Sequence, residues 1–162
     1  MTMDTMNAVV ETPGGSAQKF TYDPESRFFK LKKWLPAGMY FPYDFGFIPG
    51  TKGEDGDPLD IVIIAEFSSF PGCMIECKLI GGIKGNQSDG KSKKMIRNDR
   101  FFAVPLASVV FEKVRSMKDL NPELVNQLGE FFVNYNKLEK RKFEVAGLLT
   151  VSESLQIINN SK

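Results

Sequence analysis

Apolar and polar residues alternate over short segments through the first two thirds of the chain, a pattern typical of β-strands with one buried face. The turn signal Asp23-Pro24-Glu25-Ser26 separates the first two segments, which we therefore expect to form a hairpin. A polar loop is expected from about Lys84 to Lys94. The strands predicted in this way are residues 19–22, 27–35, 59–67, 73–83 and 95–105.

The pattern changes to helical spacing after residue 120. Asn121 is a good N-cap, Pro122 suits the first helical position, and Glu123 suits the positive end of the helix dipole. Apolar residues then recur at steps of three and four, which predicts one apolar face on a long helix to about residue 138. These residues are Leu124, Leu128, Phe131, Tyr135 and Leu138. A second, short helix is expected from Ser152, where SESLQIINN offers a cap followed by apolar residues.

The order of these elements favours one fold class. Five or more short strands with one long helix indicate an α+β protein, mainly β, with an OB-like five-stranded closed barrel and both helices packed outside. A chain of 162 residues without a linker or repeat is expected to form a single domain over residues 1–162.

Charge and composition exclude several functions. The 21 Lys and Arg residues nearly balance the 20 Asp and Glu residues, so no overall field would attract nucleic acid or an anionic membrane. No basic region followed by an apolar stretch opens the sequence, and we expect a cytoplasmic protein. The chain has no histidine, which argues against a His-based triad and a Cys/His zinc site. Cys73 and Cys77 lie about 13 Å apart on one predicted strand, too far for a disulfide.

A dense group of carboxylates precedes the strand at residues 59–67. Asp55 and Asp57 share a face of an extended chain while Asp60 has the opposite parity, so a turn is needed to gather them. Gly56 and Pro58 permit that turn. Unpaired carboxylates would repel one another, and a divalent cation removes this cost; oxygen ligands suit Mg²⁺ or Mn²⁺.

Two other interpretations of this loop compete with a magnesium site. In a calcium loop of the EF-hand kind counted from Asp55, Glu66 falls at position twelve, but Asp60 stands where a glycine is required. Solvated turn aspartates before a strand are the structural alternative. The stretch that precedes the loop, LPAGMYFPYDFGFIPGTKGEDGDPLD, argues against both.

This stretch resembles family I soluble inorganic pyrophosphatases. The family signature of Asp, any small or polar residue, Asp, Pro, an apolar residue, Asp and an apolar residue matches Asp55 to Ile61. The similarity runs from VVETPGG near residue 10 to FFVNYNKLE near residue 139. It implies hydrolysis of pyrophosphate to two phosphates by metal-activated water, and a homo-oligomer, either a hexamer or a dimer.

The resemblance also implies roles for individual residues. Asp55 and Asp60 would bind the tighter metal pair, and Asp57 would take the proton from the attacking water. Metal and substrate are implied to be bound by further residues, namely Glu11 near the outer metals and Lys19, Lys33, Arg100 and Tyr135 at the phosphates. Lys33 replaces a usual arginine and Arg100 a usual lysine. The helical spacing independently directs Tyr135 toward whatever the helix covers.

Several positions depart from the family pattern. The family usually has a tyrosine at Phe45, a glutamate at Thr21 and a lysine at Asn136. When the chain is aligned on Ala103-Val104-Pro105, the two aspartates that hold the remaining metals fall on Lys93 and Asn98. Asp99 is one residue away from Asn98 and would face the other way on a strand.

Two interpretations of these departures stay open. Lys93, Lys94 or Arg97 replaces a metal ion as fixed positive charge on pyrophosphate, or the protein is catalytically impaired and binds phosphate compounds. The intact aspartate trio favours the first. Two further function classes are single-stranded nucleic acid binding by an aromatic-rich OB-type fold and a partner-binding module. The acidic loop has the wrong sign for a phosphate backbone.

Overall fold

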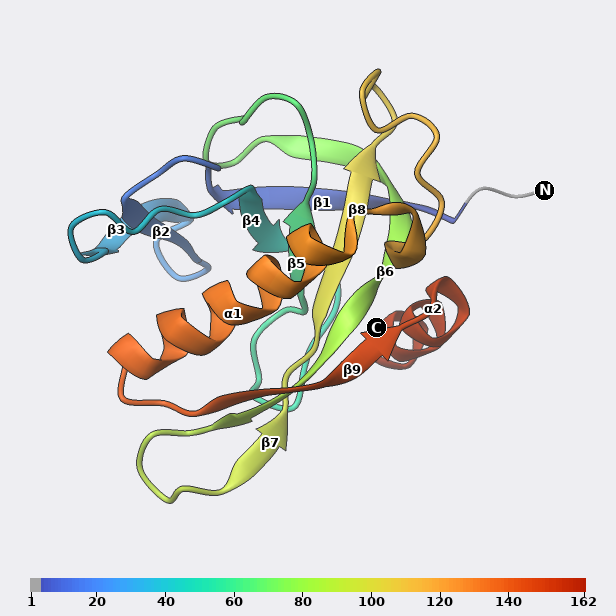
Figure 1. Cartoon of the computed structure of the whole chain (residues 1–162). Helices are drawn as coiled ribbons and strands as arrows, with labels where there is room; N and C mark the ends of the chain where they lie inside the picture. Colours follow the sequence, from blue (N-terminus) through green and yellow to red (C-terminus); the bar gives the residue numbers. More distant parts are fainter. Residues whose placement is uncertain (1–3) are drawn as a thin grey trace.

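Five strands close into a ring in the computed structural model, which describes residues 4–162 (Figure 1). The strands are β1 (Thr5–Thr12), β2 (Gln18–Asp23), β3 (Phe28–Trp34), β4 (Asp44–Phe47), β5 (Asp60–Ile63), β6 (Met74–Ser88), β7 (Met95–Arg97), β8 (Arg100–Pro105) and β9 (Phe143–Leu149). The helices are α1 (Pro122–Leu138) and α2 (Val151–Asn160), with a short 3₁₀ helix η1 (Met117–Asp119). The fold is therefore mainly β, with two α-helices beside the ring.

The ring follows the order β1, β4, β5, β8, β6, and β6 pairs again with β1. Its neighbours are antiparallel except β5 and β8, which are parallel and place Asp60 opposite Arg100. At one contact β1 and β4 approach so closely that a Cβ on Gly46 would lie 1.9 Å from the Val9 carbonyl oxygen. A glycine is thus required there. The expectation of a closed five-stranded sheet with helices outside it is confirmed.

The predicted hairpin is present as β2 and β3, which pair antiparallel in a sheet of their own. The polar loop expected from Lys84 was placed too early, since β6 continues to Ser88 and pairs there with β7 and β9. The expected strand 95–105 is interrupted at Asn98 and Asp99 and forms two strands. Both features lie in polar segments, where the alternation of apolar and polar residues gives no signal. Backbone hydrogen bonds can pair such segments without an apolar face.

Alternation along β5 and β8 divides the core into two apolar clusters, because successive side chains point to opposite faces. Ile61 and Phe101 belong to a cluster that includes Ile158 of α2. Val62 and Phe102 belong to a second cluster, which includes Phe132 of α1. Each strand therefore contributes to the core on both faces, and its first residue is left for the rim of the ring.

Helix α1 begins as predicted, since the Asn121 side chain accepts a hydrogen bond from the Glu123 N–H. Its apolar face buries Leu128 and Tyr135, while Leu138 at the end is 51% exposed. Helix α2 starts one residue earlier than expected: Thr150 is the N-cap, and Glu153 completes a capping box. The long helix brings Tyr135 to the open end of the ring.

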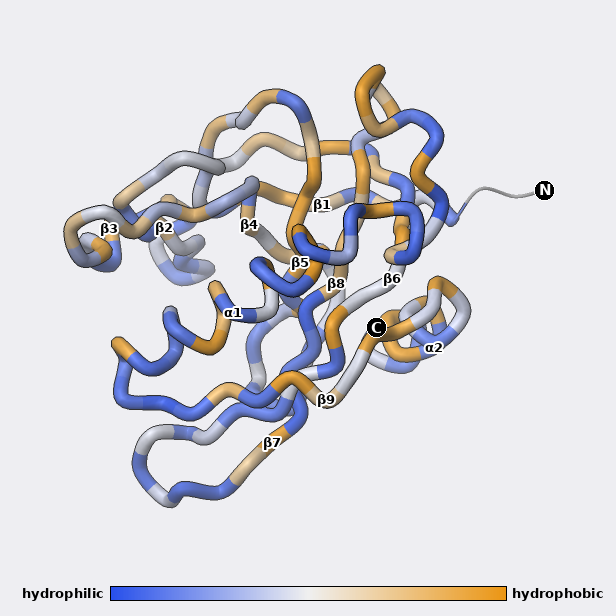
Figure 2. The backbone as a smooth tube through the Cα atoms, viewed as in Figure 1, coloured by the Kyte–Doolittle hydropathy of each residue, from blue (hydrophilic) through white to orange (hydrophobic). Residues whose placement is uncertain are grey.

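Apolar residues gather in the strands of the ring, whereas the loop between β6 and β7 is mainly hydrophilic (Figure 2). The loop that follows β8 is an exception, because Val109 and Val110 are 79% and 69% exposed there. No helix within residues 4–162 combines the length and apolar character needed to cross a bilayer. Cys73 and Cys77 are both free thiols.

Candidate active site

A cleft of about 310 Å³ opens at the rim of the ring, between the loop before β5, the β2–β3 hairpin and the last turns of α1. Its walls carry carboxylates on one side and basic and amide groups on the other. The charged residues that line it are Glu11, Lys19, Lys32, Asp55, Asp57, Asp60, Arg100, Glu139 and Arg141. Such a density of opposite charges in one cavity suits a small, highly charged ligand.

The loop before β5 turns as the sequence predicts. Gly56 has a φ of 87°, and the Gly53 N–H donates to the Asp57 carbonyl oxygen at 2.7 Å. The Asp57 N–H in turn donates to Asp55 Oδ1 at 3.0 Å. The Asp57 carboxylate accepts no hydrogen bond from any residue in 4–162 and faces the cleft. It is therefore free to accept a proton or bind a cation.

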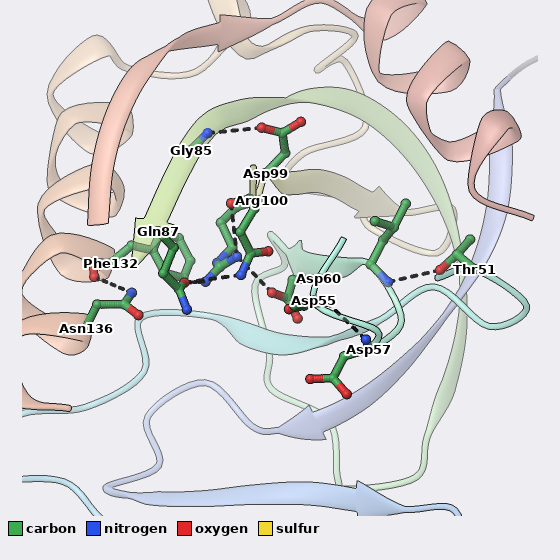
Figure 3. A network of polar contacts seen from close by, with 12 residues as sticks. Thr51, Asp55, Asp57, Asp60, Gly85, Gln87, Asp99, Arg100, Phe132 and Asn136 are labelled. Atoms are coloured by element: carbon green, nitrogen blue, oxygen red, sulfur yellow. Dashed lines mark hydrogen bonds and ion pairs between the residues drawn. The ribbon is translucent and has the colours of Figure 1, made fainter. Parts of the chain in front are cut away.

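Asp60, the first residue of β5, is held by an ion pair. Its Oδ2 lies 2.8 Å from Arg100 Nη1 on the parallel strand β8 (Figure 3). Burial raises the pKa of Asp60 to about 6, and the charges of Asp55 and Glu11 act in the same direction, against the lowering by Arg100. Additional positive charge in the cleft would therefore stabilise the ionised form of Asp60.

Glu11 reaches the cleft from β1 and is anchored by the β2 strand. Its Oε2 accepts hydrogen bonds from Thr21 Oγ1 at 3.0 Å and from the Tyr22 N–H at 2.7 Å. Burial raises the pKa of Glu11 despite these bonds. Thr21, at the position where the resemblance implies a glutamate, therefore orients Glu11 instead of adding a second charge.

Basic side chains gather around Tyr135. The amines of Lys19 and Lys33 lie 5.0 and 4.6 Å from the centre of its ring. Lys33 pairs with Glu139, whose Oε1 also accepts a hydrogen bond from the Tyr135 hydroxyl at 3.2 Å. Burial lowers the pKa of Lys19 to about 8 and raises that of the Tyr135 hydroxyl. Both cations therefore lie against the Tyr135 ring, and Lys33 is also held by the Glu139 carboxylate.

Arg100 has the most contacts of the basic residues in the cleft. Nη2 donates to Gln87 Oε1 at 3.1 Å, and Nη1 donates to the Asn98 carbonyl oxygen at 3.2 Å (Figure 3). The guanidinium carbon stands 5.2 Å from the Phe132 ring and 5.1 Å from the Phe143 ring. The group is 6% exposed, so its orientation is fixed by these neighbours.

The structure brings most of the predicted site residues together. Those that line the cleft are Glu11, Lys19, Asp55, Asp57, Asp60, Arg100 and Tyr135, along with Phe45, Thr21, Asn98 and Asn136. Lys33 stands just behind them, joined to Glu139. Lys93 is exposed in the loop between β6 and β7, with a φ of 58°, and is not one of the cleft residues.

Four charged or amide residues that line the cleft escaped the sequence analysis, namely Lys32, Gln87, Glu139 and Arg141. Glu139 follows Tyr135 by four residues, the spacing that places side chains on one helix face, so this signal was available. Gln87 was assigned to a loop, and only the extension of β6 to Ser88 shows that it faces the cleft. Asp99 points away as expected, since its Oδ1 accepts from the Gly85 N–H at 3.0 Å.

The acidic side fits a hard divalent cation by its chemistry. Carboxylate oxygens are the preferred ligands of Mg²⁺ and Mn²⁺, and here they are supplied by Glu11, Asp55, Asp57 and Asp60. Within residues 4–162, however, no three His, Cys, Asp or Glu side chains are close enough to hold one ion. The loop thus directs the aspartates into one cleft without gathering them at one point, because like charges repel.

A ring of strands with a cleft of carboxylates and basic groups belongs to a class of site suited to an anion bound together with cations. Comparison with known proteins identifies the member of this class. The family model "Inorganic pyrophosphatase" matches residues 8–162. The inorganic pyrophosphatase of Nostoc sp. is 33% identical over 156 residues, which cover 96% of this chain and 89% of that protein. That of Saccharolobus solfataricus is 34% identical over 159 residues, 98% of this chain and 90% of that protein.

Solved structures agree with the sequence comparison. An inorganic pyrophosphatase from Coxiella burnetii superposes with a TM-score of 0.88 at 27% identity, covering 98% of this chain and 94% of that one. The Thermus thermophilus inorganic pyrophosphatase gives 0.89 at 25% identity, covering 99% and 90%. The chain belongs to the inorganic pyrophosphatase family.

Proposed function

We propose that this protein hydrolyses inorganic pyrophosphate to two phosphates with the help of a divalent metal ion. The observation that carries the proposal is the meeting of Asp55, Asp57 and Asp60 with Lys19 and Arg100 in one cleft. Carboxylates are needed to hold cations, and fixed cations are needed to bind an anion that repels the carboxylates. A family member that had lost the reaction would have no need of this complete acidic trio.

The three aspartates divide the work by their contacts. Asp55 and Asp60 are each committed to a neighbour, the Asp57 N–H and Arg100 respectively, and keep one further carboxylate oxygen for the metal. Asp57 is uncommitted and accepts the proton of the attacking water. Glu11, fixed by Thr21 and Tyr22, would supply a further carboxylate for the metal. Mg²⁺, or Mn²⁺ in its place, makes water more acidic and offsets charge on phosphate oxygens.

The basic side receives the phosphates. Lys19 and Arg100 line the cleft directly, and the Tyr135 hydroxyl is directed to it by Glu139. Lys33 is held by Glu139 and Tyr135 at the edge of the cleft. A bound phosphate competes with Glu139 for Lys33 and the tyrosine hydroxyl, so these groups bind substrate after releasing a partner they already have.

Phosphate release from pyrophosphate by the purified chain tests this proposal. Release is expected to depend on Mg²⁺, to continue with Mn²⁺ and to stop when the metal is chelated. A phosphate monoester such as p-nitrophenyl phosphate serves as the matched substrate and is expected to react far more slowly. No release above a blank with either ion would favour the alternative, a binder of phosphate compounds.

Assembly and compartment are proposed separately. Large apolar side chains are exposed, with Phe67 at 83% and, at the two ends of β3, Phe28 at 72% and Trp34 at 69%. Exposed apolar groups of this kind are stabilised when they are buried between copies of a chain. We therefore propose a homo-oligomer, a hexamer or a dimer. Light scattering after gel filtration gives the mass, and a monomer at micromolar concentration would refute assembly. Two free thiols fit the reducing cytoplasm.

A further inference from the structure

Two amides and one guanidinium form the side of the cleft opposite the aspartate loop, and we call Gln87, Asn98 and Arg100 the amide wall. All three line the cleft. Gln87 Oε1 accepts two hydrogen bonds, one from Asn98 Nδ2 at 3.2 Å and one from Arg100 Nη2 at 3.1 Å. Gln87 lies near the end of β6, opposite Ile96 of β7 in the strand register, and is 8% exposed. The wall is thus a built arrangement on neighbouring strands.

The hydrogen bonds fix which atoms of Gln87 face the cleft. A guanidinium only donates, so the amide atom that contacts Arg100 is the oxygen. The Asn98 amide presents its nitrogen to the same oxygen. The Gln87 nitrogen, with its two N–H donors, has no hydrogen-bond partner among residues 4–162 and is not among the fully buried orphan atoms. It is therefore left for a ligand that accepts hydrogen bonds.

The amide wall carries no negative charge that would attract a metal ion. Asn98 has a neutral side chain, and the neighbouring carboxylate of Asp99 is 2% exposed and bonded to Gly85 and Arg97. The residue whose side chain meets Asn98 is Gln87, not Lys93, which lies in the exposed loop. Of the two positions where the resemblance implies metal-binding aspartates, one is Asn98, whose amide lies in the cleft beside Gln87 and Arg100, and the other is Lys93, which does not line the cleft.

We propose that the Gln87 side-chain amide donates directly to a phosphate oxygen of the substrate, beside Arg100 and next to Asn98, where the family resemblance implies a metal-binding aspartate. The wall is a direct oxyanion site, and the chain uses fewer metal ions in consequence. This inference rests on the proposed function. Arg100 Nη1 also contacts Asp60 at 2.8 Å, so a phosphate held by the wall lies next to the acidic side of the cleft.

Replacing Gln87→Glu tests the direct contact because it keeps the size of the side chain. Glutamate can still accept the bonds from Asn98 and Arg100, but it presents an anionic oxygen where the amide presented N–H donors. The dissociation constant of inorganic phosphate is measured by calorimetry at fixed Mg²⁺, without turnover. The number of bound Mn²⁺ ions is counted by electron paramagnetic resonance. Gln156→Glu, on the exposed face of α2, adds the same charge outside the cleft and is the matched control.

We expect Gln87→Glu to weaken phosphate binding about tenfold or more, the effect of losing a hydrogen bond to a charged group and adding repulsion. The variant is also expected to bind one additional Mn²⁺ ion. The control is expected to match the wild type in both measurements. A phosphate affinity of Gln87→Glu within twofold of the wild type overturns the inference, whatever the metal count.

A measurement on the wild-type chain keeps the test independent of the variant's folding. The side-chain amide signal of Gln87 is followed by ¹⁵N NMR, with assignment through the backbone, as inorganic phosphate is added with Mg²⁺. A shift that saturates with phosphate supports the contact, and an unchanged signal at saturation refutes it. Both experiments measure binding at equilibrium. Failure to hydrolyse pyrophosphate would refute the proposed function alone and leave these results to decide the amide wall.

Discussion

The acidic side of the cleft and the amide wall face the same space but differ in how far their polar groups are already paired. Asp57 on the acidic side has a carboxylate without a hydrogen-bond donor among residues 4–162, and its neighbours Asp55 and Asp60 keep free oxygens. On the amide wall, Arg100 has five partners or aromatic neighbours, Asp60 included, and Gln87 has two donors to its oxygen. The acidic side needs added cations to offset its negative charge. The amide wall already contains a cation, Arg100, whose orientation is fixed by its neighbours.

This difference shows how one small fold supplies two kinds of positive charge to a single anion. Diffusible ions adapt their position but depend on concentration, whereas a buried guanidinium is always present but fixed in direction. The contrast predicts that substitutions on the acidic side mainly abolish chemistry. Substitutions on the amide wall are expected to affect binding and folding together.

The largest effect is expected from Asp57→Asn, which removes the proton acceptor while preserving shape. Turnover should fall about 10³-fold, because general base catalysis typically contributes 10² to 10⁴. Unfolding should be nearly unchanged, since no hydrogen bond from residues 4–162 to this carboxylate is lost. Steady-state phosphate release measures the rate, and Asp89→Asn, in the exposed β6–β7 loop, is the control. Ordinary turnover in Asp57→Asn would exclude this residue as the base.

The second prediction concerns the ion pair that joins the two sides. Arg100→Met leaves Asp60 without its partner and should lower the free energy of unfolding by about 3 kcal/mol, as for other broken buried pairs. Catalytic efficiency should fall about 10²-fold. Adding Asp60→Asn should restore part of the stability but none of the activity. Urea denaturation of the single and double variants measures this, and strict additivity would argue against a coupled pair.

A smaller effect is expected at Lys19, whose pKa is lowered by burial to about 8 from 10.5. Between these values the unfolded chain binds the proton and the folded chain does not, so the free energy of unfolding rises with pH across that window. Lys19→Met should remove this dependence and stabilise the protein by about 1–2 kcal/mol at neutral pH.

The same lysine should lose its attraction for phosphate as the pH rises above about 8. The KM for pyrophosphate of the wild type is therefore expected to increase there, while Lys19→Met has a KM about tenfold higher throughout. Melting curves and initial rates from pH 7 to pH 10 provide both quantities. A Lys19→Met variant less stable than the wild type would show that the lysine packs favourably instead of being a buried, poorly compensated charge.

The smallest effect is expected away from both sides of the cleft. Thr150→Ala removes the N-cap bond to the Glu153 N–H and should lower stability by about 1 kcal/mol without changing turnover. Thr150→Ser retains the hydroxyl and is the control. A loss of activity in Thr150→Ala at temperatures where it stays folded would mean that α2 influences the cleft. Residues outside the two sides of the cleft would then also contribute to activity.

Much of this arrangement follows from local sequence signals. The hairpin β2–β3, the cap and apolar face of α1, and the turn at Gly56 were all predicted correctly, because turn residues, caps and periodicity act within a few residues. The three aspartates and Tyr135 were located by the family resemblance and by that same helix face. The structure places them in one cleft.

Other features depend on pairings between distant segments. The last residues of β6 are polar enough to resemble a loop, and their pairing with β7 and β9 makes them part of a strand. The position of Gln87 beside Asn98 followed from that pairing and from the length of the hairpin, neither of which a single sequence defines. The family resemblance placed Lys93 at the substrate, whereas the structure leaves it exposed in the β6–β7 loop, outside the residues that line the cleft.

The parallel pairing of β5 with β8 has a consequence for how the protein acquires its activity. Asp60 and Arg100 meet only when two strands distant in sequence align in one register, and the ring closes only when β1 pairs with β6. Contacts of such long range form slowly because closing the long intervening loop costs chain entropy before the contact contributes any stability. During refolding, helix α1 is expected to acquire its structure before the ion pair exists. Recovery of phosphate-binding ability should therefore follow the last kinetic phase and report ring closure.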